Sequence, residues 1–340
     1  MGSIAGSSLS FLGLTVACCT DSIEPYSFYL MILVLVGFAS FSSAVFEAGI
    51  FNIIGQFPAK YTQAFIAGHG VGGVVVISIN ILAYFLAGDF SKASFSKIYF
   101  GISTGMMVLS FLLFLLVQVN PFYAHYNKIV EQVAIERAQS VQQDLEAVSD
   151  CSNIWATFRE IKEIAIAILI SATIGYIIFP EFMFNTKSTK FGTPQATWFH
   201  KDMFVNTALF IANVADMVGK LLPLIPVLAF QTGPFIGLAI SRVAVVPLYL
   251  LGNLQYPGYK LPFEPYLKSD LLFFMIVGVS SMTASYLGTV SMMWAPARVK
   301  PKERPVAIAI IIVCGALGFA LGTLLSFSGK YLLLEHSTKV

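Results

Sequence analysis

Residues 306–327 read VAIAIIIVCGALGFALGTLLSF, a run that contains no charged side chain. A helix needs roughly 17–25 mostly apolar residues to cross the hydrocarbon core of a bilayer, and this run is of that length. A buried strand would be much shorter, and a strand of a membrane barrel would alternate apolar and polar residues. The segment therefore predicts a membrane-spanning helix.

The same pattern recurs along the rest of the chain. Each further candidate is a long apolar run between polar turns, without the alternation that is typical of strands. We therefore predict an all-α polytopic membrane protein with about nine transmembrane helices. The predicted spans are Ile4–Cys19, Phe28–Ile54, Ala64–Gly88, Ile98–Val119, Ile164–Phe179, Phe204–Leu228, Phe235–Leu254, Leu271–Trp294 and Val306–Phe327.

The composition is also that of a membrane protein. Charged residues make up 11% of the chain and hydrophobic residues 57%, whereas soluble domains carry about 25% charged residues; the mean hydropathy is +0.79. The net charge of +2 and the lack of a long Lys/Arg run argue against nucleic-acid binding. Two of the four cysteines, Cys18 and Cys19, are adjacent and the others lie far away, so they form no CxxC metal motif. No hydrolase or zinc-protease motif occurs either, and we predict no metal site, no cofactor and no enzymatic activity.

One long polar stretch divides the chain. Residues 120–163 mix acidic and basic side chains with Gln and Ala, which is typical of a hydrated helix or a tether. We predict a transmembrane half of four spans at 1–119, a cytoplasmic linker at 120–163 and a half of five spans at 164–330, with a plain long loop as the alternative to a linker. The orientation follows from the basic loop Arg298–Arg304, because short basic loops stay in the cytoplasm.

The sixth predicted span carries charged side chains at membrane depth. Asp216 and Lys220 are four residues apart, so they lie on one helical face and can form an ion pair, and Asn213 extends this polar face. A charged residue inside a spanning helix costs at least about 2.5 kcal/mol, so it normally faces a cavity or a partner. The pattern indicates a substrate pathway that binds hydroxyl groups; the alternative is an internal ion pair without a role in binding.

Three more ionisable residues lie inside predicted spans. Arg242 is expected either to contact the linker or close a gate, or to extend its side chain to a membrane interface. Glu47 and His69 are expected either to bind substrate or relay protons, or to make polar packing contacts. The glycines of Gly68–Gly73 around His69 fit no phosphate-binding motif and predict a close crossing of two helices.

Four segments resemble signatures of the equilibrative nucleoside transporter family and occur in the order of that family. In the second of them, the Asp-x-x-Gly-Lys ending is similar to the family's Asp-x-x-Gly-Arg. The segments are Gly55–Gly73 (GQFPAKYTQAFIAGHGVGG), Asn213–Lys220 (NVADMVGK), Arg242–Leu248 (RVAVVPL), and the loop Ala295–Pro301 taken together with Gly318–Gly322.

The resemblance implies facilitative transport of nucleosides, and in some members of nucleobases, by alternating access in a major-facilitator-like fold of two lobes. By similarity to the family, Asp216 and Lys220 contact the ribose, His69 occupies a position that faces the base, and Phe319 matches an apolar pocket position of the last helix. The expected partners are a nucleoside and the lipid bilayer. We predict a multi-pass protein that is located in the plasma membrane rather than in an endomembrane.

The chain also departs from the family pattern. Lys220 replaces an Arg and cannot make the same two-pronged contact, and His69 replaces a Gln and can titrate. The chain starts at about the family's third span, so we expect an N-terminally short member with an incomplete N-terminal lobe. Two alternatives stay open: a truncated, non-transporting isoform that associates with or regulates a full-length relative, and a proton-coupled endomembrane carrier in which Glu47 or His69 titrates.

Overall fold

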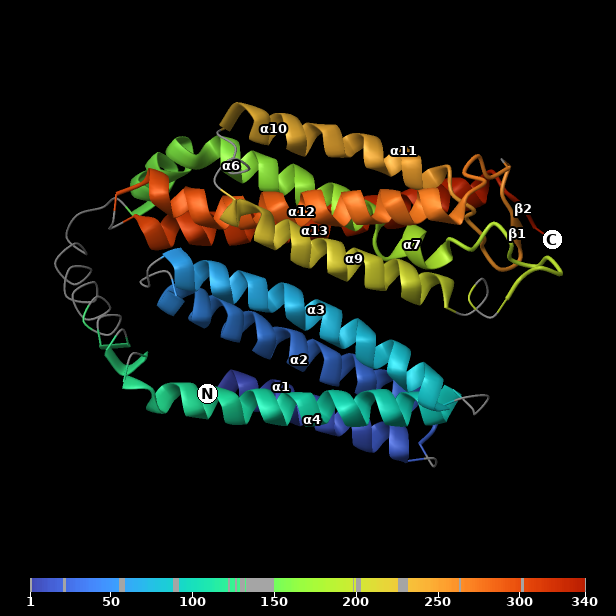
Figure 1. Cartoon of the computed structure of the whole chain (residues 1–340), viewed down its shortest axis with the longest axis horizontal. Coiled ribbons are helices and arrows are strands. Elements are labelled where there is room, and N and C mark those ends of the chain that lie inside the picture. The colour runs from blue at the N-terminus through green and yellow to red at the C-terminus, as the bar shows by residue number, and fades with distance from the viewer. Residues whose placement is uncertain are drawn as a thin grey trace. The chain divides into compact units, whose positions relative to one another are not determined.

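The computed structural model describes residues 2–20, 23–54, 59–87, 92–121, 123–125, 127–128, 132, 150–197, 199, 203–225, 232–262, 264–300 and 303–339. Within these residues, eight helices are long and apolar enough to cross a membrane. The prediction of an all-α polytopic membrane protein is therefore confirmed. The eight helices are α1 Gly2–Cys19, α2 Pro25–Ile54, α3 Ala59–Ala87, α4 Lys92–Val119, α6 Asp150–Ile178, α9 Phe204–Leu221, α12 Asp270–Arg298 and α13 Arg304–Glu335 (Figure 1).

The helices group into two compact units. Unit 1 comprises Met1–Thr62 and Ser78–Val148, and unit 2 comprises Gln63–Ile77 and Ser149–Val340. Helix α3 thus contributes residues to both units. The division at residues 119 and 163 remains a prediction, and α6 begins at Asp150 within the predicted linker.

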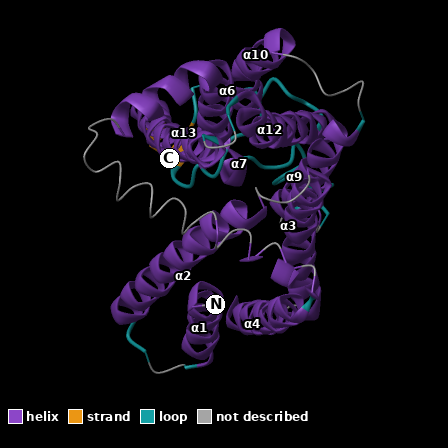
Figure 2. Ribbon diagram, turned by 90° about the vertical axis from the view of Figure 1, so that its left-hand side faces the viewer, coloured by secondary structure: helices purple, strands orange, loops and turns teal. Residues whose placement is uncertain are grey.

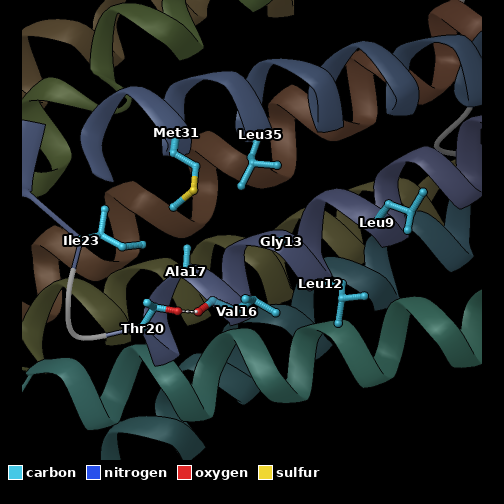
Figure 3. Close-up of a pocket in the computed structure, with 9 residues that line it drawn as sticks. All are labelled: Leu9, Leu12, Gly13, Val16, Ala17, Thr20, Ile23, Met31 and Leu35. Atoms are coloured by element: carbon cyan, nitrogen blue, oxygen red, sulfur yellow. Dashed lines mark hydrogen bonds between the residues drawn. The ribbon is translucent and has the colours of Figure 1, made fainter. Parts of the chain in front are cut away.

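In unit 1, α1 packs against α2 and α4. The Ser7 and Ser43 hydroxyls are 3.4 Å apart across α1 and α2, and those of Thr15 and Thr104 are 2.9 Å apart across α1 and α4. An apolar pocket of about 420 Å³ opens between α1 and α2 (Figure 3). The hydroxyl of Thr20, at its edge, donates to the Val16 carbonyl of its own helix. The pocket is lined by Leu9, Leu12, Gly13, Val16, Ala17, Thr20, Ile23, Met31 and Leu35, which include none of the predicted site residues.

In unit 2, α6, α12 and α13 lie side by side (Figure 1, Figure 2). Gly318 and Gly322, four residues apart on α13, bring this helix against α6. A Cβ atom added at Gly318 would lie 2.7 Å from the Leu169 carbonyl oxygen, and one added at Gly322 would overlap the carbonyl oxygen of Thr173. Small residues at this spacing let two backbones approach closely, which is a common way to join helices in lipid.

Two apolar clusters fill the interior of unit 2. One is centred on Ile164, Phe235 and Leu287, from α6, α10 and α12. In the other, the ring of Phe204 at the start of α9 stacks on that of Phe273 in α12, with 5.7 Å between the ring centroids. These clusters fix α9 and α12 against the rest of the unit.

The seventh predicted span, Phe235–Leu254, is an interrupted helix that ends earlier than expected. It consists of α10 Thr232–Ser241, the 3₁₀ turn η3 Arg242–Ala244 and α11 Val245–Leu250. Pro247 has no backbone N–H to donate to the preceding turn, so a change of helix type there is physically reasonable. Its apolar part, Phe235–Leu250, is shorter than the eight spans.

Other boundaries also differ from the predictions. In the sixth span, α9 is followed by a 3₁₀ turn, η1 Leu222–Leu224; the predicted end at Leu228 lies outside the described residues. Helix α12 extends to Arg298, so the first residues of the predicted Ala295–Pro301 loop are helical. The Arg298 guanidinium lies 3.8 Å from the Glu163 carboxylate of α6.

The connections at the other end of unit 2 are held by polar contacts. Asp270, in the first turn of α12, accepts hydrogen bonds from the Ser188 hydroxyl at 2.6 Å and from the Thr189 amide at 2.8 Å. Glu181, in the short helix α7 Glu181–Asn185, pairs with Lys330 of α13 at 2.9 Å. A two-stranded ribbon of β1 Tyr259–Lys260 and β2 Thr338–Lys339 joins the C-terminal end to the loop before α12 (Figure 1).

Candidate functional site

Helix α9 carries the predicted polar face and packs closely on α12. Gly219 is the residue that allows the approach, because a Cβ atom at this position would overlap the Met282 carbonyl oxygen of α12. The Phe204–Phe273 stack holds the same two helices together nearer their starts. The polar face of α9 is therefore built on two helices that have little freedom to separate.

Asp216 and Lys220 form the ion pair that their spacing predicts. The Lys220 Nζ lies 2.6 Å from Oδ2 of Asp216. The other carboxylate oxygen, Oδ1, accepts a hydrogen bond from the hydroxyl of Ser285 on α12. The side chains of Asp216 and Lys220 remain 29% and 16% exposed. The pair is thus oriented by a neighbouring helix and still accessible at its surface.

The glycine-rich part of α3 packs against the same face of α9, and both segments belong to unit 2. A Cβ atom at Gly70 would lie 2.9 Å from Cα of Met217 and 3.2 Å from Cδ of Lys220. A Cβ atom at Gly73 would overlap the amide oxygen of Asn213. The predicted close helix crossing is confirmed at Gly70 and Gly73.

Asn213 is half-buried where α3 meets α9. Its Nδ2 donates to the Leu209 carbonyl of its own helix at 2.9 Å, and its Oδ1 points toward Gly73. One of the two amide N–H groups is therefore used inside α9. His69 directly precedes Gly70, and its side chain is exposed. The structure thus brings Asn213, Asp216 and Lys220 onto one face, with the His69 segment of α3 beside them.

Arg242 lies elsewhere in unit 2 and is only 2% exposed. Its Nη1 donates to the Ser280 carbonyl at 2.5 Å and to the Thr283 hydroxyl at 2.6 Å, both on α12. Its Nε has no partner among the described residues. The side chain does not extend to an interface, so that alternative is wrong; its contacts hold η3 against α12.

Phe319 and Glu47 are not part of the α9 face. The Phe319 ring, on α13, lies 4.3 Å from the Tyr176 ring of α6 between centroids and is 45% exposed. Glu47 is exposed on α2 in unit 1. The predicted site residues therefore lie in four places: the α9 face with the His69 segment, Arg242 at η3, Phe319 on α13 and Glu47 on α2. The ion pair on α9 combines defined polar contacts with partial exposure.

Sequence reasoning missed Ser285, which orients the Asp216 carboxylate from another helix. The region around it, GVSSMTAS at residues 278–285, is rich in small and hydroxyl-bearing residues. Such residues mark helix contacts in membranes and form hydrogen bonds across them, so this richness was the available signal.

Comparisons with known proteins agree with this architecture. A family described as "Nucleoside transporter" matches residues 30–331. The chain is 25% identical over 350 residues to equilibrative nucleoside transporter 1 of Rattus norvegicus, covering 96% of this chain and 74% of that protein. It is 23% identical over 353 residues to the Homo sapiens protein of the same name, with the same two coverages. It is also 25% identical over 333 residues to equilibrative nucleoside transporter 3 of Rattus norvegicus, covering 91% of this chain and 65% of that protein.

The family match extends over most of the sequence and ends within α13, the last helix of unit 2. It is a match to transporters rather than to enzymes, in keeping with a chain made of apolar helices. This multi-pass membrane protein belongs to the nucleoside transporter family.

Proposed function

We propose that this chain moves nucleosides passively across a membrane by alternating access, with Asp216 and Lys220 binding the sugar. The observation that carries the proposal is the ion pair on α9, which is oriented by Ser285 and partly exposed. Family membership supports the substrate class, because the matched relatives are named equilibrative nucleoside transporters. For the membrane of residence we propose the plasma membrane.

The chemistry of the pair suits a neutral, hydroxyl-rich ligand. A carboxylate offers about four acceptor positions, and Lys220 and Ser285 use two of those on Asp216. The ammonium of Lys220 has three N–H donors, so it can also serve a sugar oxygen. Because the two charges cancel, a nucleoside can bind and leave without burying a net charge.

Lysine in place of the family's arginine reduces the number of directional contacts that this position can make with the sugar. An ammonium is a compact donor on a flexible stem, whereas a guanidinium presents a planar fork of N–H groups. We propose that the carboxylate of Asp216 makes the directional contacts and that Lys220 mainly balances its charge. Asn213 supplies a further polar group on the same face.

The other two predicted substrate-binding residues, His69 and Phe319, suit contacts with the nucleobase rather than with the sugar. His69 is exposed beside Gly70, and we propose that its ring meets the nucleobase. The exposed ring of Phe319, backed by Tyr176, offers an apolar surface of the kind that a base prefers.

The direct test is uptake of labelled uridine into proteoliposomes that contain the purified chain. We expect Asp216→Asn to lower uptake about tenfold or more, since the amide has one acceptor oxygen instead of two and carries no charge to offset that of Lys220. Glu335→Gln, at an exposed carboxylate near the end of α13, is the matched control and should take up uridine like the wild type.

The outcomes separate the parts of the proposal. If Asp216→Asn and the wild type take up uridine equally, the role of the pair in sugar binding is wrong. If the inserted wild-type chain takes up no nucleoside, the chain does not transport alone. Uptake of uracil, which has no sugar, tests the extension to nucleobases: if the wild type carries uracil, Asp216→Asn should carry it equally well.

A further inference from the structure

Ser285 occupies an unusual position among the hydroxyl-bearing residues of α12. The hydroxyls of Thr283, Thr289 and Ser291 donate to carbonyl oxygens of their own helix, at 2.7–2.8 Å. This is the usual arrangement for such residues in spanning helices. The Ser285 hydroxyl instead donates across to Asp216 on α9. It is therefore part of the polar group on α9 rather than of the α12 backbone.

The hydrogen-bonding capacity of Ser285 is not exhausted by this contact. A hydroxyl has one donor and two acceptor positions, and the donor is used on Asp216. No hydrogen bond to the Oγ of Ser285 is present in the part of the chain that the structure describes. Its side chain is half-buried, like that of Asp216 beside it. The free acceptor positions of both groups are thus next to one another on an accessible surface.

A hydrogen-bonded pair of acceptors suits a vicinal diol. Two hydrogen-bonded oxygens lie about 2.7 Å apart, which is comparable to the distance between hydroxyl oxygens on neighbouring carbons of a sugar ring. A ribose can therefore donate one hydroxyl to Asp216 and the adjacent one to Ser285. A deoxyribose, which lacks one of them, can satisfy one acceptor only.

We propose that Ser285 accepts a hydrogen bond from one hydroxyl of the ribose 2′,3′-diol while Asp216 accepts from the other. Ser285 is then the residue by which the carrier favours ribonucleosides over deoxynucleosides. The inference rests on the proposed function, because it assigns a specificity to the same sugar site. The close contact of Gly219 with Met282, three residues before Ser285, keeps the two acceptors together.

The first test uses the wild-type chain in proteoliposomes. Uptake of labelled uridine is inhibited with unlabelled uridine, 2′-deoxyuridine and 3′-deoxyuridine. We expect at least one deoxy compound to need an about three- to tenfold higher concentration for half-inhibition, which is the usual effect of one lost hydrogen bond. Equal inhibition by all three compounds overturns the inference. Absence of any uridine uptake is instead a failure of the proposed function.

The second test asks whether Ser285 is the cause of the preference. Ser285→Ala weakens binding of all three compounds by loosening Asp216, so the informative quantity is the ratio between uridine and the disfavoured deoxy compound. We expect this ratio to fall to about one in Ser285→Ala and to persist in Ser285→Thr, which keeps the hydroxyl. Ser291→Ala, on the same helix with its hydroxyl bonded to Leu287, is the control and should keep the wild-type ratio.

A ratio that stays at the wild-type value in Ser285→Ala overturns the assignment and leaves Ser285 as a positioning residue for Asp216. Ser285→Gly is a second variant that also removes the hydroxyl and is tolerated in spanning helices. It keeps the test decisive if the alanine variant inserts poorly.

Discussion

Tyr256, in the loop between α11 and β1, has a buried hydroxyl with no partner among the described residues. Burial, reinforced by the nearby Glu181 carboxylate, raises the pKa of Tyr256 to about 12, from an ordinary value of about 10. The neutral phenol is favoured in the folded state, so the unfolded chain loses this proton first as the pH rises. Its contribution to stability is present below about pH 10 and is lost between about pH 10 and 12.

We therefore expect Tyr256→Phe to remove part of the alkaline loss of stability. The wild type should lose about 2–3 kcal/mol more than the variant between pH 9 and 12, since each pKa unit corresponds to about 1.4 kcal/mol. At neutral pH the variant should be as stable as the wild type or slightly more so, because an unpaired buried hydroxyl is removed. Thermal unfolding in detergent across this pH range measures both effects. If the stabilities of the wild type and the variant fell in parallel above pH 10, the role of Tyr256 in the alkaline loss would be wrong.

Single residues also show why the site could be predicted only in part. The Asp216–Lys220 pair follows from spacing, because helical geometry alone brings these side chains together. Ser285 could not be predicted in the same way. Many Ser and Thr hydroxyls in this chain bond their own helix, as in Ser10 and Thr173. The small and hydroxyl-bearing residues at 278–285 indicate a helix contact, but they do not show which hydroxyl reaches across it.

At the scale of elements, glycine spacing sets how helices pair. We expect Gly322→Ala to destabilise the contact of α13 with α6 by about 1–3 kcal/mol, because the new methyl group overlaps the Thr173 backbone. Gly315→Ala, on the same helix with open space around it, is the matched control. It should leave stability unchanged or raise it by up to about 1 kcal/mol through helix propensity. Thermal unfolding in detergent compares the two variants. Equal unfolding temperatures would show that α13 and α6 are not in close contact at Gly322 in solution.

The spans themselves were predictable because a bilayer selects long apolar helices almost regardless of which residues fill them. Their exact limits and partners were not. The 3₁₀ turn at Arg242–Ala244 and the extension of α12 to Arg298 are examples of limits that the apolar pattern did not predict. In the same way, nothing local to Gly219 indicates that it contacts Met282, since the two lie far apart in the sequence.

At the scale of the whole molecule, the proposed carrier should equalise the substrate concentration on the two sides of the membrane and not accumulate substrate on one side. The charges of Asp216 and Lys220 cancel, and a nucleoside such as uridine is neutral, so no ion is needed to balance binding. We expect uridine inside proteoliposomes to level off at the outside concentration, with or without a gradient between about pH 5.5 and 7.5. Accumulation above that level, driven by the proton gradient, would favour a coupled mechanism, and Glu47→Gln and His69→Gln would then show which side chain carries the proton.

The close fit of Gly219 against Met282 has a consequence for the direction of transport. Helices that touch through their backbones move as one block, so the sugar-binding oxygens on α9 and α12 keep their mutual geometry whichever way a carrier opens. In a carrier of the proposed kind, a nucleoside would then meet the same chemical surroundings from either face of the membrane. Net flow would be decided by the concentrations on the two sides and not by the protein.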